Sequence, residues 1–223
     1  MSTADYNLGV IGSLGVAFAI HGLDEHREYH TQIERILTTA KDWRLRKLEK
    51  QATKLPENQQ RKYLALNRPH RWETSFPEQH RASVVIAAFA FFEKMIVEIA
   101  SDAALWSGQE WRVPTNNRIG AAKAFLWKHG QLRRPNKEEW APIMKIATLR
   151  NHLVHHGLYI HGSNVSDATW TAVESIPGLR MDEEGDIDIG LEVCTYTFEA
   201  IESVLQAIHD DIVKKWEEKA DEA

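Results

Sequence analysis

The clearest chemical potential in this chain lies in eight consecutive residues, Arg150-Asn151-His152-Leu153-Val154-His155-His156-Gly157. Residues 138–156 are expected to form one helix, because their apolar side chains recur at helical spacing and spread over one broad arc. Arg150 projects into the middle of that arc, where an apolar side chain is expected. An unpaired guanidinium there would be costly, so it requires a partner: a carboxylate, a phosphate or a symmetric copy of the same helix.

These residue types suit the cleavage of RNA by its own 2′-hydroxyl. Histidine is the side chain whose ordinary pKa suits proton transfer near neutral pH, and His155 takes that role. Arg150 supplies fixed donors for the negative charge that develops around phosphorus. Asn151 lies one helical turn before His155. Gly157 is expected to end the helix. His155 and His156 then lie in its last turn, near the surface and not deep in a bundle.

The spacing of Arg150 and His155 favours a dimer. Five residues apart on a helix, their Cα atoms are separated by about 7.5 Å along the axis and by about 140° of rotation. One protomer therefore sets the two side chains obliquely, whereas two copies across a symmetry axis can bring them together. An isologous dimer through this helix would also bury the apolar arc around Arg150.

A structural alternative involves Glu93. This carboxylate lies against the apolar face of a second strongly periodic helix, over 78–106. Two opposite charges on apolar faces suggest a buried Glu93–Arg150 ion pair that sets the helix register and does no chemistry. In that alternative the chain is a non-catalytic helical module that binds RNA or another protein.

The other histidines are weaker candidates. His152 and His156 share one helical face and could chelate a metal with His161 as a third ligand. The glutamate that zincins carry between two such histidines is missing from the sequence, and no cysteine is near. We therefore predict neither a metal nor a cofactor. The histidines near the N-terminus are interpreted as surface residues of a charged helix: His21, His26 and His30.

The composition is that of a globular chain whose 223 residues can bury a sizeable core. A single cysteine, Cys194, excludes an intramolecular disulfide and suits a reducing compartment. The longest apolar run, 8–20, has no basic leader and is shorter than the ~20 residues that span a bilayer. We interpret it as a core segment and expect a cytoplasmic protein that does not contact a membrane. Its Gly9, Gly12 and Gly15 indicate close helix packing or a loop rather than nucleotide binding.

The net charge is −5, but the charged residues are distributed unevenly along the chain. Residues 41–71 include ten basic and three acidic side chains, whereas 182–223 include three basic and fourteen acidic ones. A partner with phosphates would therefore meet the first region. The alternative is that these cations solvate the outer face of a helix. The weak candidates for RNA binding are Arg44, Lys47, Arg61, Lys62, Arg68 and Arg71.

Helical periodicity dominates the rest of the chain and predicts an all-α antiparallel helical bundle with a small β-hairpin insertion before the last helix. We divide the chain into a helical extension with a basic linker, 1–77, and a helical domain, 78–223. The expected elements are a charged helix over 24–55, a polar linker or flexible arm over 57–77, helices over 78–106, 114–127 and 138–156, a hairpin over 179–189 and a last helix over 195–219.

The Arg-polar-x-x-x-His motif at the end of the third core helix resembles that of HEPN domains, a helical family named for its occurrence in higher eukaryotes and prokaryotes. The resemblance includes the helix with Phe91-Phe92-Glu93, the short-strand insertion and the closing helix, and it covers about 78–219. It implies a metal-independent endoribonuclease in which two protomers line one cleft. Arg150 and His155 would then be the catalytic pair, with Asn151 orienting them.

The same resemblance implies the partners of the protein. RNA would be the substrate, and a homodimer would form through the Arg150-bearing helix. The biological role would be that of a toxin or an antiviral defence effector, restrained by an antitoxin or another regulatory protein. Glu93 and His156 are the supporting residues of the expected site.

Overall fold

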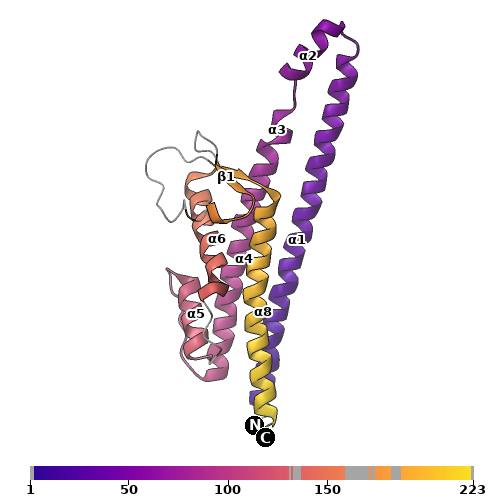
Figure 1. Ribbon diagram of the computed structural model, residues 1–223. Helices are drawn as coiled ribbons and strands as arrows, with labels where there is room; N and C mark the ends of the chain where they lie inside the picture. The colour runs from indigo at the N-terminus through magenta and orange to yellow at the C-terminus, as the bar shows by residue number, and fades with distance from the viewer. Residues whose placement is uncertain are drawn as a thin grey trace.

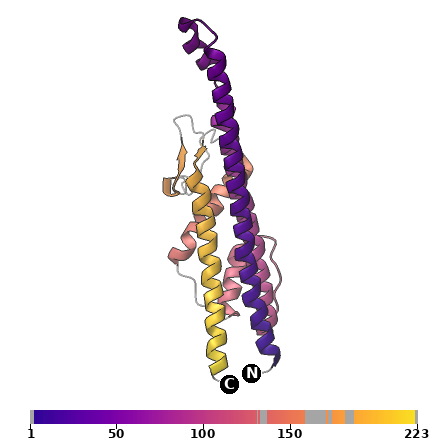
Figure 2. The same cartoon turned by 90° about the vertical axis from the view of Figure 1, so that its right-hand side faces the viewer.

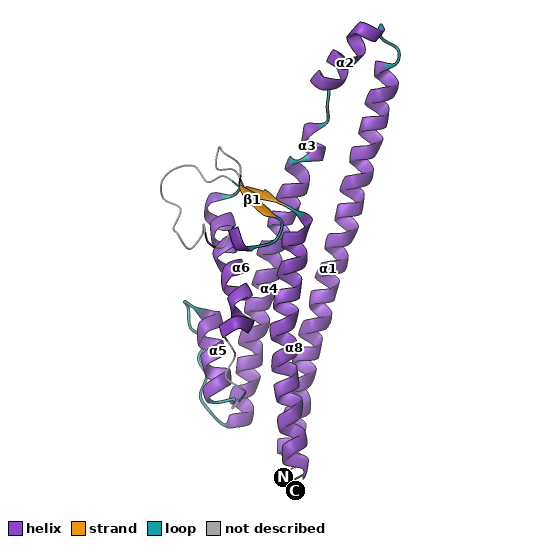
Figure 3. Cartoon of the chain, in the orientation of Figure 1, coloured by secondary structure: helices purple, strands orange, loops and turns teal. Residues whose placement is uncertain are grey.

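The structure is a computed structural model that describes residues 3–130, 132, 137–158, 171, 174–181 and 187–221. It is mostly helical, with one small antiparallel hairpin before the last helix, as Figures 1 and 3 show. The predicted all-α class is therefore confirmed. The elements are α1 (Thr3–Ala52), α2 (Glu57–Leu66), α3 (His70–Glu73), α4 (Ser75–Ser107), α5 (Arg118–Lys128), α6 (Lys137–His156), β1 (Leu179–Met181), β2 (Ile187–Ile189) and α8 (Leu191–Asp221).

Three long helices form the length of the bundle. Helix α1 packs against both α4 and α8, and it runs beside α8 along most of the molecule in Figure 2. The shorter α5 and α6 pack on α4, and α6 also reaches α8. The first turns of α1 and the last turns of α8 lie at the same end of the bundle (Figure 1). The opposite end is closed by the hairpin.

One hydrophobic core joins these helices. Phe92 of α4, Ile146 of α6 and Leu205 of α8 are fully buried in it. Val16 and Leu23 of α1 belong to the same cluster. The boundary between 77 and 78 also falls inside α4. The described residues therefore form one core to which the first 77 residues contribute.

Helix α1 includes the apolar opening of the chain as well as the charged segment that follows. It begins at Thr3 rather than at residue 24. Gly15 lies where a Cβ would be 3.3 Å from Asp102 Oδ2, which confirms close helix packing at this glycine. In the described part of the chain, the apolar stretches of the helices are too short to cross a bilayer.

The segment 57–77, expected as a polar linker or flexible arm, is mostly helical. Pro56 precedes the first residue of α2, and Pro69 precedes the first residue of α3. Pro77 lies in the first turn of α4, where a missing N–H costs nothing. Pro56 and Pro69 thus lie in short breaks directly before helices, and Pro77 lies inside one. With the distal half of α1, these short helices form an arm that extends beyond the hairpin end of the bundle (Figure 1).

The hairpin has the predicted position. Leu179 pairs with Ile189 and Met181 with Ile187 in an antiparallel register. Buried Leu179, Ile187 and Ile189 join the main core, so the hairpin caps the bundle. Gly178 has a φ of +77°, a conformation that suits glycine, at the entry to β1. The acidic tip expected at 183–185 lies outside the described residues.

Leu23→Ala should lower the free energy of unfolding by about 2–5 kcal/mol, because Leu23 is fully buried where α1 meets the common core. Urea denaturation followed by circular dichroism measures this change. The matched control is Ile36→Ala on the same helix, where the side chain is 59% exposed and the expected change is below about 0.5 kcal/mol. A separate early transition in wild-type protein, shifted alone by Leu23→Ala, would contradict a single core.

Candidate functional site

Helix α6 fixes the orientation of the Arg150 motif. Its buried face packs against α4 and α8, and this determines which side chains point outward. Gly157 has a φ of +68° and donates its N–H to the carbonyl of Leu153 at 3.1 Å, so the helix ends where the sequence predicted. The fully or nearly buried residues of α6 are Trp140, Ile143, Ile146, Leu149, His152 and Leu153.

Arg150 is half-buried at the edge of this face. Its Nη1 donates a hydrogen bond to Asn151 Oδ1 at 3.0 Å. Its Nε is buried without a hydrogen-bond partner, and no described carboxylate lies within ion-pair distance of the guanidinium. Among the described residues, the cationic fork is therefore held in place by an amide and faces no neutralising carboxylate.

Asn151 and His155 are exposed on the outer face of α6, one turn apart. His155 lies next to His156, with 6.4 Å between the ring centroids. No hydrogen bond joins Arg150 to His155 within the chain, which agrees with their oblique spacing. Val154, which is 46% exposed, and Met144, which is 59% exposed, border these polar residues. The motif thus lies on an open surface with apolar neighbours.

The alternative ion pair between Glu93 and Arg150 does not form. Glu93 Oε1 instead lies 3.3 Å from Nη1 of Arg118, which begins α5. Periodicity correctly placed Glu93 on a half-buried face of α4. Periodicity does not show which neighbouring helix packs beside Glu93. In the structure α5 packs there, and its Arg118 supplies the cation.

The second histidine pair of α6 has a different environment. His152 is 8% exposed, and its ring centroid lies 5.0 Å from that of His156. Burial, followed by the charge of His156, lowers the pKa of His152. His161, the third ligand considered for a metal, lies outside the described residues. Within the described residues, His152 and His156 have no third metal-ligating side chain beside them.

The basic residues of the arm lie beyond the hairpin end of the bundle, whereas α6 lies along α4 (Figure 1). Arg44 stacks over Trp72 at 3.8 Å, and Lys47 lies 5.1 Å from the centre of Trp43. Arg68 pairs with Glu73 at 2.7 Å. The other candidates for RNA binding are exposed: Arg61, Lys62 and Arg71.

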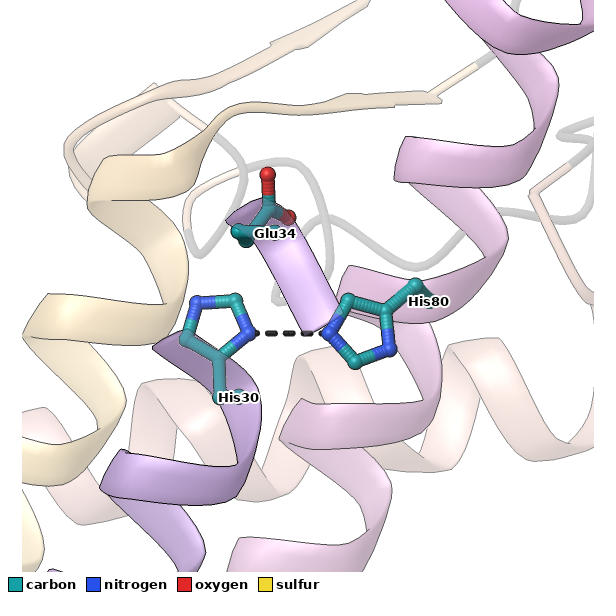
Figure 4. Close-up of side chains that lie close together, drawn as sticks. All are labelled: His30, Glu34 and His80. Carbon is teal, nitrogen blue, oxygen red and sulfur yellow. Dashed lines mark hydrogen bonds between the residues drawn. The ribbon is translucent and has the colours of Figure 1, made fainter. Parts of the chain in front are cut away.

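A second cluster of reactive side chains was missed by the sequence analysis. His30 Nδ1 of α1 lies 3.1 Å from His80 Nε2 of α4, and Glu34 lies one turn beyond His30, as Figure 4 shows. One ligand atom from each of the three residues lies within 4.8 Å of the others. His30 is only 5% exposed, so its interpretation as a surface residue is wrong.

Arg81 completes this cluster. Its Nε and Nη2 donate to the two oxygens of Glu34 at 2.8 and 3.0 Å, and its Nη1 donates to the carbonyl of Ile189 at 3.1 Å. Burial raises the pKa of Glu34, but the hydrogen bonds and charge of Arg81 outweigh it, and the pKa is lowered overall. Burial also lowers the pKa of His30 and of His80; the charge of Glu34 partly opposes this, and the charge of Arg81 adds to it. The net shift of both groups favours the neutral imidazole.

The sequence did contain a signal for His30. The core residues Val16, Ala19 and Leu23 follow each other by three and four positions, and His30 comes seven positions after Leu23 on the same stripe. A polar residue on a core stripe requires a partner. His80 lies fifty positions later on another helix, so local periodicity could not identify it as that partner.

The free energy of unfolding should fall as pH decreases from 7.5 to 5.5. The folded-state pKa values of His30 and His80 lie below the ordinary value of 6.5, so the unfolded chain binds more protons in this range. Each group contributes at most about 1.4 kcal/mol per pH unit. Urea denaturation at a series of pH values measures the slope, and His80→Gln should make it shallower. The control His21→Gln, on an exposed site, should keep the wild-type slope; an unchanged slope in His80→Gln would refute this assignment.

Comparison with known proteins gives no match: the chain matches no family model, no curated protein and no solved structure.

Proposed function

We propose that the protein is a metal-independent endoribonuclease of the HEPN type, with its active site at Arg150, Asn151 and His155. The observation that carries this proposal is the state of Arg150, a half-buried guanidinium oriented by Asn151 and paired with no described carboxylate. Such a group is a suitable donor fork for a phosphate oxygen. His155 lies exposed on the same end of α6, where RNA has access.

In the proposed reaction, His155 accepts the proton of a ribose 2′-hydroxyl as that oxygen attacks the adjacent phosphorus. Arg150 donates to the non-bridging oxygens as negative charge develops on them. The bond from phosphorus to the 5′-oxygen breaks, and the proton held by His155 passes through water to the leaving oxygen. The products are a 2′,3′-cyclic phosphate and a 5′-hydroxyl, and no metal takes part.

The proposed active form is an isologous homodimer through the outer face of α6. Met144, Asn151 and His155 lie within about 40° of one another around the helix axis, so one face presents polar and apolar groups together. Exposed Met144 and Val154 supply apolar area for self-association. The partner copy would bring a second Arg150 and His155 to the same cleft.

The alternative function is that of a non-catalytic module whose basic arm binds RNA or an acidic protein. Exposed Trp43 beside Lys47 on the arm favours it, because aromatic and cationic groups together suit nucleic acid. The Glu93–Arg150 pair no longer supports this alternative, because Glu93 is paired with Arg118. For the catalytic protein we propose the role of a toxin or defence effector restrained by a regulatory protein.

His155→Ala should reduce RNA cleavage in the presence of EDTA by at least about 100-fold, because proton transfer by a positioned histidine contributes that much or more. Wild-type protein and variant are incubated with a mixed RNA pool, and the new ends are mapped. The expected ends carry a 2′,3′-cyclic phosphate.

The matched control for this assay is His21→Ala, which removes an exposed histidine from α1 and should retain full activity. Cleavage that survives in His155→Ala would remove the catalytic assignment. Binding of RNA without cleavage by the folded dimer, abolished by charge removal in the arm, would favour the non-catalytic module.

Val154→Asp should convert the dimer to a monomer and abolish cleavage together with it, because it puts a charge into the proposed apolar interface. Size-exclusion chromatography with light scattering measures the mass. Leu105→Asp on α4 is the matched control, since Leu105 is 70% exposed on another helix and should leave both mass and cleavage unchanged. An active monomer of Val154→Asp would contradict the shared cleft.

A further inference from the structure

The cluster of His30, Glu34 and His80 has the donor set of a metal site. Two imidazole nitrogens and one carboxylate oxygen are the ligands of many Zn²⁺ centres that keep a fourth position open. These residues come from two helices far apart in sequence, and Figure 4 shows the two rings facing each other with Glu34 beside them. We propose that these three residues bind one divalent transition-metal ion, with Zn²⁺ as the best-matched ion.

The distance between the two ring nitrogens fits this assignment. Two nitrogens bound to one ion at ~2.05 Å are about 2.9 Å apart at a right angle and about 3.3 Å apart at the tetrahedral angle. His30 Nδ1 and His80 Nε2 are 3.1 Å apart, between these values. The Glu34 oxygen, within 4.8 Å of them, completes the set after a side-chain movement of up to about 1.5 Å.

Burial leaves the His30 ring few polar partners. His30 is 5% exposed, and the nitrogen that would bind the ion, Nδ1, faces His80 Nε2. Without an ion, the interaction available to this buried ring is a single hydrogen bond to another imidazole.

Arg81 acts as the supporting group that orients the carboxylate. It holds both oxygens of Glu34, and each oxygen keeps a second lone pair for the ion. Asp188 lies close enough to raise the pKa of Arg81, so a further negative charge offsets the local cations. The thiol of Cys194 points instead at the carbonyl of Arg81, 3.8 Å away, and is not part of the cluster.

A groove between α1 and α8 lies beside the cluster. This groove has a volume of about 750 Å³ and is lined by His30 and Glu34 together with Thr38, Phe198 and Glu199. Water or a small anion can therefore reach the ion. The ion itself would link α1 to α4 at the level where α1 leaves the bundle to form the arm.

The test uses the full-length protein, stripped with a chelator and desalted, with Zn²⁺ alone as the ligand. Equilibrium dialysis with metal analysis should give one tightly held ion per chain, and Zn²⁺ should raise Tm by several degrees. His80→Gln should weaken this binding at least 10-fold. His156→Gln and His21→Gln, which remove imidazoles from the end of α6 and from exposed α1, should bind as the wild type does.

Equal affinity in wild type and His80→Gln, or loss of the ion in His156→Gln, overturns the proposal. X-ray absorption of the zinc-loaded wild type needs no variant. It should show two imidazoles with oxygen as the remaining donor, and a sulfur ligand or fewer than two imidazoles would also overturn the proposal. The outcome is independent of RNA cleavage, which is measured in EDTA.

Discussion

The ion pair between Arg81 and Glu34 joins more of this structure than any other described polar contact. Glu34 lies on α1, Arg81 on α4, and the third arm of the guanidinium binds the carbonyl of Ile189 in the hairpin. Cys194 of α8 donates its thiol to the Arg81 carbonyl at 3.8 Å. Both side chains of the pair are less than 20% exposed, so removing one partner would leave a poorly solvated charge. The pair therefore fixes how three helices and the hairpin meet.

The hairpin transmits this constraint to the candidate active site. Strand β2 accepts the hydrogen bond from Arg81 at Ile189. Two residues earlier, Ile187 donates its N–H to the carbonyl of Leu158, just beyond the end of α6, at 2.8 Å. One short strand thus connects the histidine cluster with the segment that ends the motif helix. The buried face of α6 also holds this helix in place. The positions of Arg150 and His155 therefore depend on the packing of α6 and on the hairpin that Arg81 contacts.

Local patterns predicted the local features well. Gly157 and the apolar spacing before it were enough to define the end of α6, and the short alternating segments defined the hairpin. The polar segment 57–77 is mostly helical, because a proline such as Pro56 or Pro69 precedes a helix as readily as it ends one. Glu93 pairs with Arg118 and not with Arg150, because α5 packs on α4 beside Glu93. Such contacts between helices follow from tertiary packing, which periodicity along one helix does not contain.

Arg150 differs from the other half-buried arginines of the bundle in its partner, and this difference supports a distinct role for it. The other half-buried arginines of the bundle, in its described part, each lie beside a carboxylate from another helix. Burying a cation without such a partner is unfavourable, so a fold selected for stability is expected to pair each of its half-buried arginines. Arg150 departs from it, with an amide from its own helix as the partner. A guanidinium kept in place without a described carboxylate partner retains its affinity for an external anion, as the proposed binding of a phosphate requires. The paired residues are Arg27 with Glu202, Arg81 with Glu34 and Arg118 with Glu93.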